Sequence, residues 1–324
     1  MPRIRRRRQP GTTLTPARPE AAPRVQVVQD ASIRWYHIEA PGPEEFAWLE
    51  EEFPFHELDI EDVRSRRQRP KVDEYPDYLF VVLHFPRYDK ELKRLFVAEV
   101  DAFVGPDFVV TVLPGPLKPL AALFERISRD EERRLETFAK GSGYLFYEIL
   151  DAIYDACMPM LDPIGSKLDA IEDRIFDRHD DAVRLILDVK QEVIAFRRIV
   201  NPQRPVLRVL ERRSERYLAS DDLDVYYDDI IDKSERIWDV LENYKEVIDA
   251  LEGANEMETN REQNRILRIL TVLSVIFLPP NLIAGIWGMN THVPGEGTVT
   301  GFALVVLFEM VVLVGSVAYF KRWF

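Results

Sequence analysis

The stretch "NRILRILTVLSVIFLPPNLIAGIWGMN", residues 264–290, decides the fold of this chain. From Ile269 onward it has no lysine or arginine, and none occurs before Lys321. At 1.5 Å per residue, about 20 apolar residues cross the roughly 30 Å hydrocarbon core of a bilayer. Ile269–Gly288 and Gly301–Phe320 both have that length. We therefore expect two neighbouring transmembrane helices, at about 269–288 and at 301–320, and not a buried soluble hairpin.

Basic residues flank the two spans but are absent between them. Three arginines (261, 265 and 268) precede the first span, Lys321 and Arg322 follow the second, and the loop 289–300 has no base. The positive-inside rule then places both termini in the cytoplasm and the loop outside the cell membrane. Residues 321–324 are the basic cytoplasmic C-terminus. No apolar segment follows the N-terminal arginine cluster, so no signal peptide is expected. Residues 1–30 are predicted to be a disordered, basic and Pro-rich tail.

The rest of the chain divides by composition. Residues 31–115 contain β-branched and aromatic runs such as "DYLFVVLHF" and "DFVVTVL" among helical patterns, which predicts a cytoplasmic α/β domain. Residues 116–220 have no strand signal and are predicted to be a helical hairpin region. The fold class is therefore an α+β cytoplasmic domain, followed by a long stalk helix and the two membrane helices.

The stalk is predicted over residues 221–288, because no proline occurs from Asp221 until Pro279. At 1.5 Å per residue this helix is about 100 Å long and continues into the first membrane span. An apolar seam with heptad spacing follows one side: Ile230, Ile237, Leu241, Tyr244, Ile248 and Leu251. A lone rod cannot bury such a seam, so self-association is expected.

Continuing the seam into the membrane gives a line that holds nearly every polar side chain of the first span: Asn264, Leu267, Thr271, Ser274, Leu278, Asn281 and Gly285. An unpaired polar atom in hydrocarbon costs several kcal/mol, so this line faces other helices or water. Hydrogen bonding between helices is one interpretation. A pore wall with hydrophobic constrictions at Leu267 and Leu278 is the other, and four polar residues on one line favour it.

At the outer end of this line stand Gly288, Met289 and Asn290. A ring of asparagine carbonyl oxygens could bind the water shell of a cation without removing it. Mg²⁺ dehydrates reluctantly and keeps several waters, so it suits such an entrance. The glycine would allow a sharp turn where the helix ends.

These residues resemble the CorA family of divalent-cation channels, whose signature is Gly-Met-Asn at this location. The similarity extends through residues 264–290, through "FHELDIEDVRSRRQRPKVDEYPDYLFVVL" at residues 55–83, and to the "KRWF" terminus. The resemblance implies a funnel-shaped homopentamer in which the stalk becomes the pore-lining span. It implies that residues 288–290 form the external entrance and that Asn264, Leu267, Leu278 and Asn281 line the pore.

The resemblance also implies that cytoplasmic Mg²⁺, which is both substrate and regulatory ligand, binds acids between subunits. Asp229 is the first candidate by its distance from the Gly-Met-Asn signature, and Asp232 is the second. The loop departs from the magnesium type, because it reads "THVPGEG", which shifts its acid to Glu296 and adds His292. This variant loop leaves the zinc-transporting branch of the superfamily open.

The sequence therefore favours a Mg²⁺ channel gated by cytoplasmic Mg²⁺. Two alternatives remain open: a transporter of Zn²⁺ or another transition metal on the same fold, and a membrane-anchored helical scaffold without transport. We expect no enzyme, since we find no nucleophile–base set, phosphate loop or Cys/His cluster, and no cofactor. The expected partners are further copies of the chain, membrane lipid and divalent cations, but no nucleic acid. Glu309, an acid inside the second span, has no assigned role.

Overall fold

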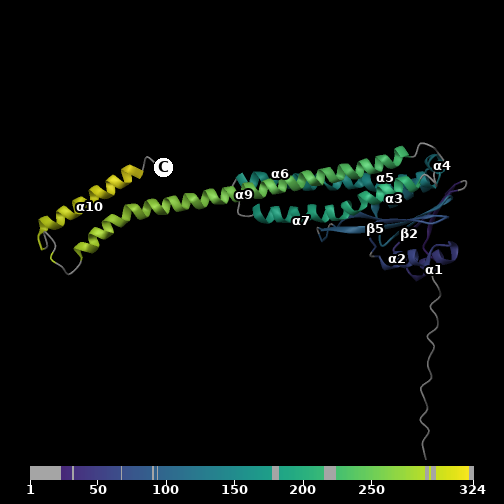
Figure 1. Ribbon diagram of the computed structural model, residues 1–324, viewed down its shortest axis with the longest axis horizontal. Helices are drawn as coiled ribbons and strands as arrows, with labels where there is room; N and C mark the ends of the chain where they lie inside the picture. Colours follow the sequence, from purple (N-terminus) through teal and green to yellow (C-terminus); the bar gives the residue numbers. More distant parts are fainter. Residues whose placement is uncertain are drawn as a thin grey trace, which may run out of the picture. The chain divides into compact units, whose positions relative to one another are not determined.

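The computed structural model describes residues 23–30, 33–66, 68–89, 91–92, 94–176, 182–214, 224–288, 292 and 297–320. The chain divides into two compact units. The first comprises Met1–Ile171 and Arg184–Ile248, and the second comprises Glu172–Val183 and Asp249–Phe324. The long helix α9, Asp224–Trp287, contributes to both (Figure 1).

The first unit is built on a six-stranded sheet with the order β1-β2-β6-β5-β4-β3. Its strands are β1 (Gln26–Asp30), β2 (Ile33–Glu39), β3 (Lys71–Glu74), β4 (Leu79–Asp89), β5 (Arg94–Val104) and β6 (Phe108–Leu113). The β2–β6 pair is parallel, and the other pairs are antiparallel. The inner strands are rich in apolar residues because helices cover both faces of the sheet.

On one face, α1 (Pro43–Glu52) and α2 (Glu57–Ser65) bury Leu49 and Ile60 against Phe80 and Phe103. On the other face, α3 (Lys118–Arg129) and α5 (Ser142–Cys157) supply aromatic contacts. The ring centroids of Trp35 and Phe124 are 4.9 Å apart, and those of Phe85 and Tyr154 are 5.3 Å apart. Edge-to-face pairs of this kind stabilise a core beyond the area that they bury.

Helices follow the sheet without further described strands. They are α4 (Glu131–Ala139), η1 (Met158–Met160), α6 (Asp162–Phe176), α7 (Ala182–Val200), η2 (Asn201–Gln203), α8 (Arg204–Ser214), then α9 and α10 (Val299–Phe320). The part of α9 near its end and the whole of α10 are long and apolar enough to cross a membrane. The predicted fold class, an α/β part followed by one long helix and a second apolar helix, is thus confirmed. The homopentamer stays a prediction.

The interpretation of the seam on α9 is wrong in one respect. Ile230, Ile237, Leu241 and Ile248 are at most 1% exposed within the single chain, and Leu251 is 6% exposed. Helix α9 packs on other helices of the first unit: the Tyr227 hydroxyl donates to Gly143 O of α5 at 3.0 Å, and the Tyr244 hydroxyl donates to Leu161 O, just before α6, at 3.3 Å. The chain's own helices therefore bury the seam, and its periodicity gives no evidence for self-association.

The start of the fold also differs from expectation. Gln26–Asp30, predicted to belong to the N-terminal tail, forms β1 and pairs antiparallel with β2. The β-branched pair Val27-Val28 favours a strand, and in this edge strand Val28 is buried while Val27 stays exposed. Residues 1–22 lie outside the described residues, as do residues 221–223 at the predicted start of the stalk. The second apolar helix starts at Val299 instead of Gly301, because Thr298 Oγ1 accepts from Gly301 N at 3.1 Å as an N-cap.

Candidate functional site

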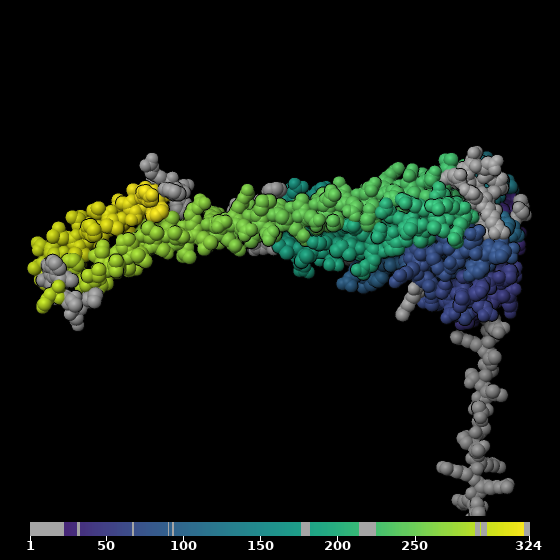
Figure 2. All heavy atoms as spheres, in the orientation of Figure 1, coloured from purple at the N-terminus to yellow at the C-terminus, as the bar shows by residue number. Residues whose placement is uncertain are grey.

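The second unit contains an antiparallel hairpin of the end of α9 and α10 (Figure 2). The half-buried residues of this hairpin occur at intervals along each helix. On α9 they are Val272, Ile276, Pro279, Pro280, Ile283 and Trp287, and on α10 they are Gly301, Val305, Glu309, Val312, Leu313, Ser316 and Phe320. An apolar groove of about 570 Å³ is lined by residues of both helices: Ile283, Ile286 and Trp287 of α9, and Gly301, Leu304, Val305 and Phe308 of α10.

The predicted polar line lies on a different side of α9. At 100° per residue, its mean direction is roughly 150° away from that of the three α9 residues that line the groove. All seven of its members are exposed in the chain: Asn264, Leu267, Thr271, Ser274, Leu278, Asn281 and Gly285. Helix α10 therefore covers one side of α9 and leaves the polar line uncovered. This juxtaposition was not deducible from the spacing of α9 alone.

Two of the four polar side chains on the line are satisfied by their own helix. Thr271 Oγ1 donates to Leu267 O at 2.8 Å, and Ser274 Oγ donates to Leu270 O at 2.9 Å. Such bonds to the carbonyl four residues earlier are available to Ser and Thr in a helix. Of the four polar side chains on the line, Asn264 and Asn281 therefore still require water or another helix as a hydrogen-bond partner. In the described part of the chain, neither carboxamide has a hydrogen-bond partner.

The entrance motif is described only in part. Gly288 N donates to Ala284 O at 2.9 Å and continues the helical pattern. Its φ is not left-handed, and a Cβ would stand 3.1 Å from Ala284 O. The glycine is thus favoured by close approach to that carbonyl and not by the sharp turn that we expected. Met289, Asn290 and Glu296 lie outside the described residues.

The candidate regulatory acids lie on α9 in the first unit. Asp229 and Asp232 are both exposed. Lys233, one turn after Asp229, has its Nζ 3.5 Å from Asp229 Oδ2 and 2.6 Å from Asp155 Oδ1, and it also donates to Asp151. Although partial burial opposes it, the bonds to Asp151 and Asp155 raise the pKa of Lys233. Burial raises the pKa of Asp151 despite the lysine.

A lysine therefore already occupies the acidic cluster to which Asp229 belongs, which the sequence reading missed. Among the described residues of one chain, no group of three or more His, Cys, Asp or Glu side chains is placed to hold a metal ion. A regulatory ion on Asp229 would need ligands from a second copy or displacement of Lys233.

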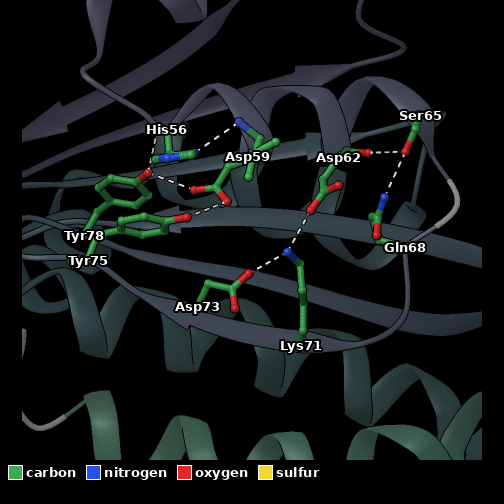
Figure 3. Close-up of polar contacts among 10 residues, drawn as sticks. His56, Asp59, Asp62, Ser65, Gln68, Lys71, Asp73, Tyr75 and Tyr78 are labelled. Carbon is green, nitrogen blue, oxygen red and sulfur yellow. Dashed lines mark hydrogen bonds and ion pairs between the residues drawn. The ribbon is translucent and has the colours of Figure 1, made fainter.

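The segment 55–83 joins α2 to the strands β3 and β4 (Figure 3). Asp59 is 1% exposed and accepts from Tyr78 Oη at 2.8 Å and from Tyr75 Oη at 3.1 Å. Burial and the Asp59 carboxyl raise the pKa of Tyr75 to about 12. Lys71 Nζ lies between Asp62 at 2.7 Å and Asp73 at 2.5 Å. The polar residues of this segment therefore form hydrogen bonds and ion pairs that hold α2 against the sheet.

Two buried acids lie on β5, on the same face of the sheet as α2. Glu99 and Asp101 are 6% and 2% exposed, and in the described part of the chain Glu99 Oε1 and Asp101 Oδ1 have no hydrogen-bond partner. His84 Nε2 is 3.4 Å from Glu99 Oε2. Burial, and then the neighbouring Glu99 carboxylate, raises the pKa of Asp101 well above its usual value.

Comparison with known proteins gives a family match. Residues 30–322 match the family described as "CorA-like Mg2+ transporter protein". The Bacillus subtilis protein YfjQ is 30% identical over 307 residues, which cover 93% of this chain and 93% of YfjQ. The "Cobalt/magnesium transport protein CorA" of Thermotoga maritima is 27% identical over 273 residues, 83% of this chain and 76% of that protein.

The fold has a close counterpart among solved structures. The structure titled "The complete structure of CorA magnesium transporter from Methanocaldococcus jannaschii" superposes with a TM-score of 0.79 at 23% identity. The match covers 91% of this chain and 92% of that one. It includes the α/β part, the long helix and the second apolar helix, so it supports this fold over 91% of the chain.

Proposed function

Since the chain belongs to the CorA-like Mg²⁺ transporter family and is thus a divalent-cation transporter and not an enzyme, we propose that it is a Mg²⁺ channel of the cell membrane. Hydrated Mg²⁺ passes a ring of Asn290 side chains and then the polar line of α9, and both termini are cytoplasmic. The printed name of the Thermotoga maritima relative, a cobalt/magnesium transport protein, supports these metals as cargo.

The arrangement of the α9–α10 hairpin carries this proposal. Helix α10 packs on the side of α9 that holds Ile283 and Trp287, while Asn281 and Leu278 remain exposed on the other side. When copies of α9 surround an axis with α10 outside, Asn264 and Asn281 gain water as a partner. Leu267 and Leu278, which are 58% and 67% exposed in one chain, then form apolar constrictions. The family resemblance supports five copies.

The driving force is the membrane potential. An inside-negative potential supplies about 2.3 kcal/mol per charge for each 100 mV, so a divalent cation gains about twice that amount. Cytoplasmic Mg²⁺ closes the channel by binding near Asp229 and Asp232 at the boundary between copies. Lys233 competes with Mg²⁺ for Asp229. The channel therefore closes at a higher Mg²⁺ concentration than it would if Asp229, Asp151 and Asp155 had no lysine beside them.

The test is metal uptake into proteoliposomes that contain the full chain or its Asn290→Ala variant, with Mg²⁺, Co²⁺, Ni²⁺ and Zn²⁺ offered in turn. We expect the wild type to pass Mg²⁺ best and the variant to pass little. Zn²⁺ flux that a proton gradient stimulates, above Mg²⁺ flux, would instead favour the transition-metal transporter. Equal and negligible flux of every metal in both proteins would favour the scaffold without transport.

A further inference from the structure

Three arginines mark the point where α9 reaches its apolar span. Arg261, Arg265 and Arg268 follow one another at intervals of four and three residues, so they lie on one side of the helix. The next residue, Ile269, begins the long stretch without Lys or Arg. Before the arginines, residues 246–260 hold five acids and no base. The helix therefore changes from acidic to basic within the last two turns before the span.

The basic side of α9 is not the side of the polar line. At 100° per residue, the mean direction of the three arginines is roughly 120° from that of the polar line and within about 30° of that of the α9 residues that line the groove. The arginines thus continue the side of α9 on which α10 packs. Arg265 and Arg268 stand at the level of Asn264 and Leu267, on another side of the same turns.

Helix α10 leaves these arginines uncovered. Trp287 and Gly301 both line the groove between the two helices. Arg268 precedes Trp287 by 19 positions, and Phe320, the last residue of α10, follows Gly301 by 19 positions. Because both helices rise by the same distance per residue, α10 ends at about the level of Arg268. All three arginines are exposed in the chain.

The acids beside the arginines leave most of this charge available. Arg261 Nη1 is 3.6 Å from Glu258 Oε2, and Arg265 Nη1 is 3.7 Å from Glu262 Oε2, each pair being three residues apart on the helix. The two arginine side chains remain 79% and 64% exposed, and exposed ion pairs at such distances contribute little. In the part of the chain that the structure describes, Arg268 forms no ion pair.

We propose that Arg261, Arg265 and Arg268 form a binding site for the phosphate groups of anionic phospholipids in the cytoplasmic leaflet. The guanidinium group presents its N–H donors in a planar fork that matches phosphate oxygens. The occupant is lipid and not soluble phosphate, because the site borders the apolar span and is open on its side. Each basic residue near an anionic surface strengthens binding by about fivefold. The leaflet follows from the orientation in the proposed function.

The site regulates the ion path, and this second step also rests on the proposed function. In a ring of α9 copies with the polar line inside, the arginines point outward to the headgroups. Lipid phosphate bound there draws the outer side of α9 away from the axis, at the turns that carry Leu267. The Leu267 constriction then widens, so flux rises with the fraction of anionic lipid in the cytoplasmic leaflet. We expect a rise of about fivefold, the effect of one arginine at the surface.

Thermal unfolding of the full chain in a neutral detergent tests the site without any flux. Phosphatidylglycerol should raise the unfolding temperature more than phosphatidylcholine does, and added salt should reduce the difference. The double substitution Arg265→Gln and Arg268→Gln should abolish the extra shift, whereas Arg265→Lys and Arg268→Lys together should retain most of it. Arg236→Gln, an exposed change on the same helix, is the matched control.

Two outcomes of this measurement would overturn the lipid site. One is an equal shift with the two lipids, and the other is an extra shift that survives the double glutamine substitution. Inorganic phosphate at the same phosphate concentration should not replace phosphatidylglycerol. An equal shift with inorganic phosphate would show a site for soluble phosphate and would overturn the assignment to lipid.

Mg²⁺ flux into proteoliposomes with and without phosphatidylglycerol tests the coupling. Because anionic lipid also attracts Mg²⁺ to the membrane surface, the wild type is compared with the double glutamine and double lysine variants in identical lipid. Lys321 and Arg322, which follow α10 in the sequence, stay unchanged in all three proteins. The increase of flux with phosphatidylglycerol should be about fivefold larger in the wild type than in the glutamine variant, and the lysine variant should keep it.

An equal increase in all three proteins would overturn the coupling. Absence of any flux in all of them would refute the proposed channel, whereas the unfolding temperatures would still decide the lipid site.

Discussion

Lys233 Nζ lies 3.5 Å from Asp229 Oδ2, one helical turn away on α9, and the same ammonium group also bonds Asp151 and Asp155 of α5. The lysine therefore neutralises part of an acidic cluster that would otherwise repel itself. It also connects the stalk helix to the helices that cover the sheet. The cluster keeps an excess of negative charge, so a divalent cation at Asp229 would compete with an internal cation.

Replacing Lys233 should therefore make the free energy of unfolding depend more strongly on Mg²⁺. Without the ammonium group, Lys233→Gln leaves three carboxylates close together. We expect the variant to lose about 1–3 kcal/mol in EDTA and to regain more than the wild type when Mg²⁺ is added. Thermal unfolding of the purified full chain measures both changes. Arg236→Gln, an exposed change on the same helix, is the control, and an equal response of the two variants would refute competition at Asp229.

Asp101 should make the protein less stable as pH rises. Because its pKa is raised in the folded state, the folded chain binds more protons than the unfolded chain between the two pKa values. Stability then falls with increasing pH, by up to about 1.4 kcal/mol per pH unit within that window. Asp101→Asn removes this dependence, so it should stabilise the protein at pH 7 and approach the wild type below the usual aspartate pKa. Unfolding temperatures measured across pH check this, and destabilisation at pH 7 would contradict it.

Ile237→Ala tests whether the chain itself buries the seam of α9. The side chain is 0% exposed within one copy, so the substitution should cost about 2–5 kcal/mol of folding stability. Val225→Ala, at a 69% exposed position of the same helix, should cost little. Chemical unfolding measures both effects. Loss of oligomeric state without loss of folding stability would instead show that the seam joins copies.

Sequence patterns predicted the helices and strands of this fold better than they predicted the contacts between them. The heptad spacing of Ile230, Ile237 and Leu241 correctly indicated one apolar side of a helix. Periodicity does not say what covers that side, however, and other parts of the same chain do so. The bonds of Thr271 and Ser274 to their own helix have no signal in a pattern of residue types. The lysine that meets Asp229 could have been suspected from its spacing of four residues, whereas its contacts with α5 depend on tertiary structure.

Leu278 should behave as a barrier to ions under the proposed function. Leu278→Asn places an amide at the constriction and should allow water to enter it. At high internal Mg²⁺, when the channel is closed, we expect Mg²⁺ flux through the variant to rise about tenfold or more. A change of about 1.4 kcal/mol in the equilibrium between the dry and the hydrated constriction is enough for this. Flux into Mg²⁺-loaded liposomes measures this leak. The same substitution at Leu273, on another side of α9, should not leak, and equal leaks in the two variants would contradict the assignment.

The central claim is that α9 turns its polar line toward a shared aqueous path and its other side toward α10. The most direct measurement is the labelling of single cysteines by a charged, water-soluble thiol reagent in proteoliposomes, in a background in which the buried Cys157 is replaced by alanine. We predict rapid labelling of Asn281→Cys and Ser274→Cys, protection of both by Mg²⁺, and no labelling of Ile276→Cys. Labelling of Ile276→Cys with none at Asn281→Cys would contradict the account.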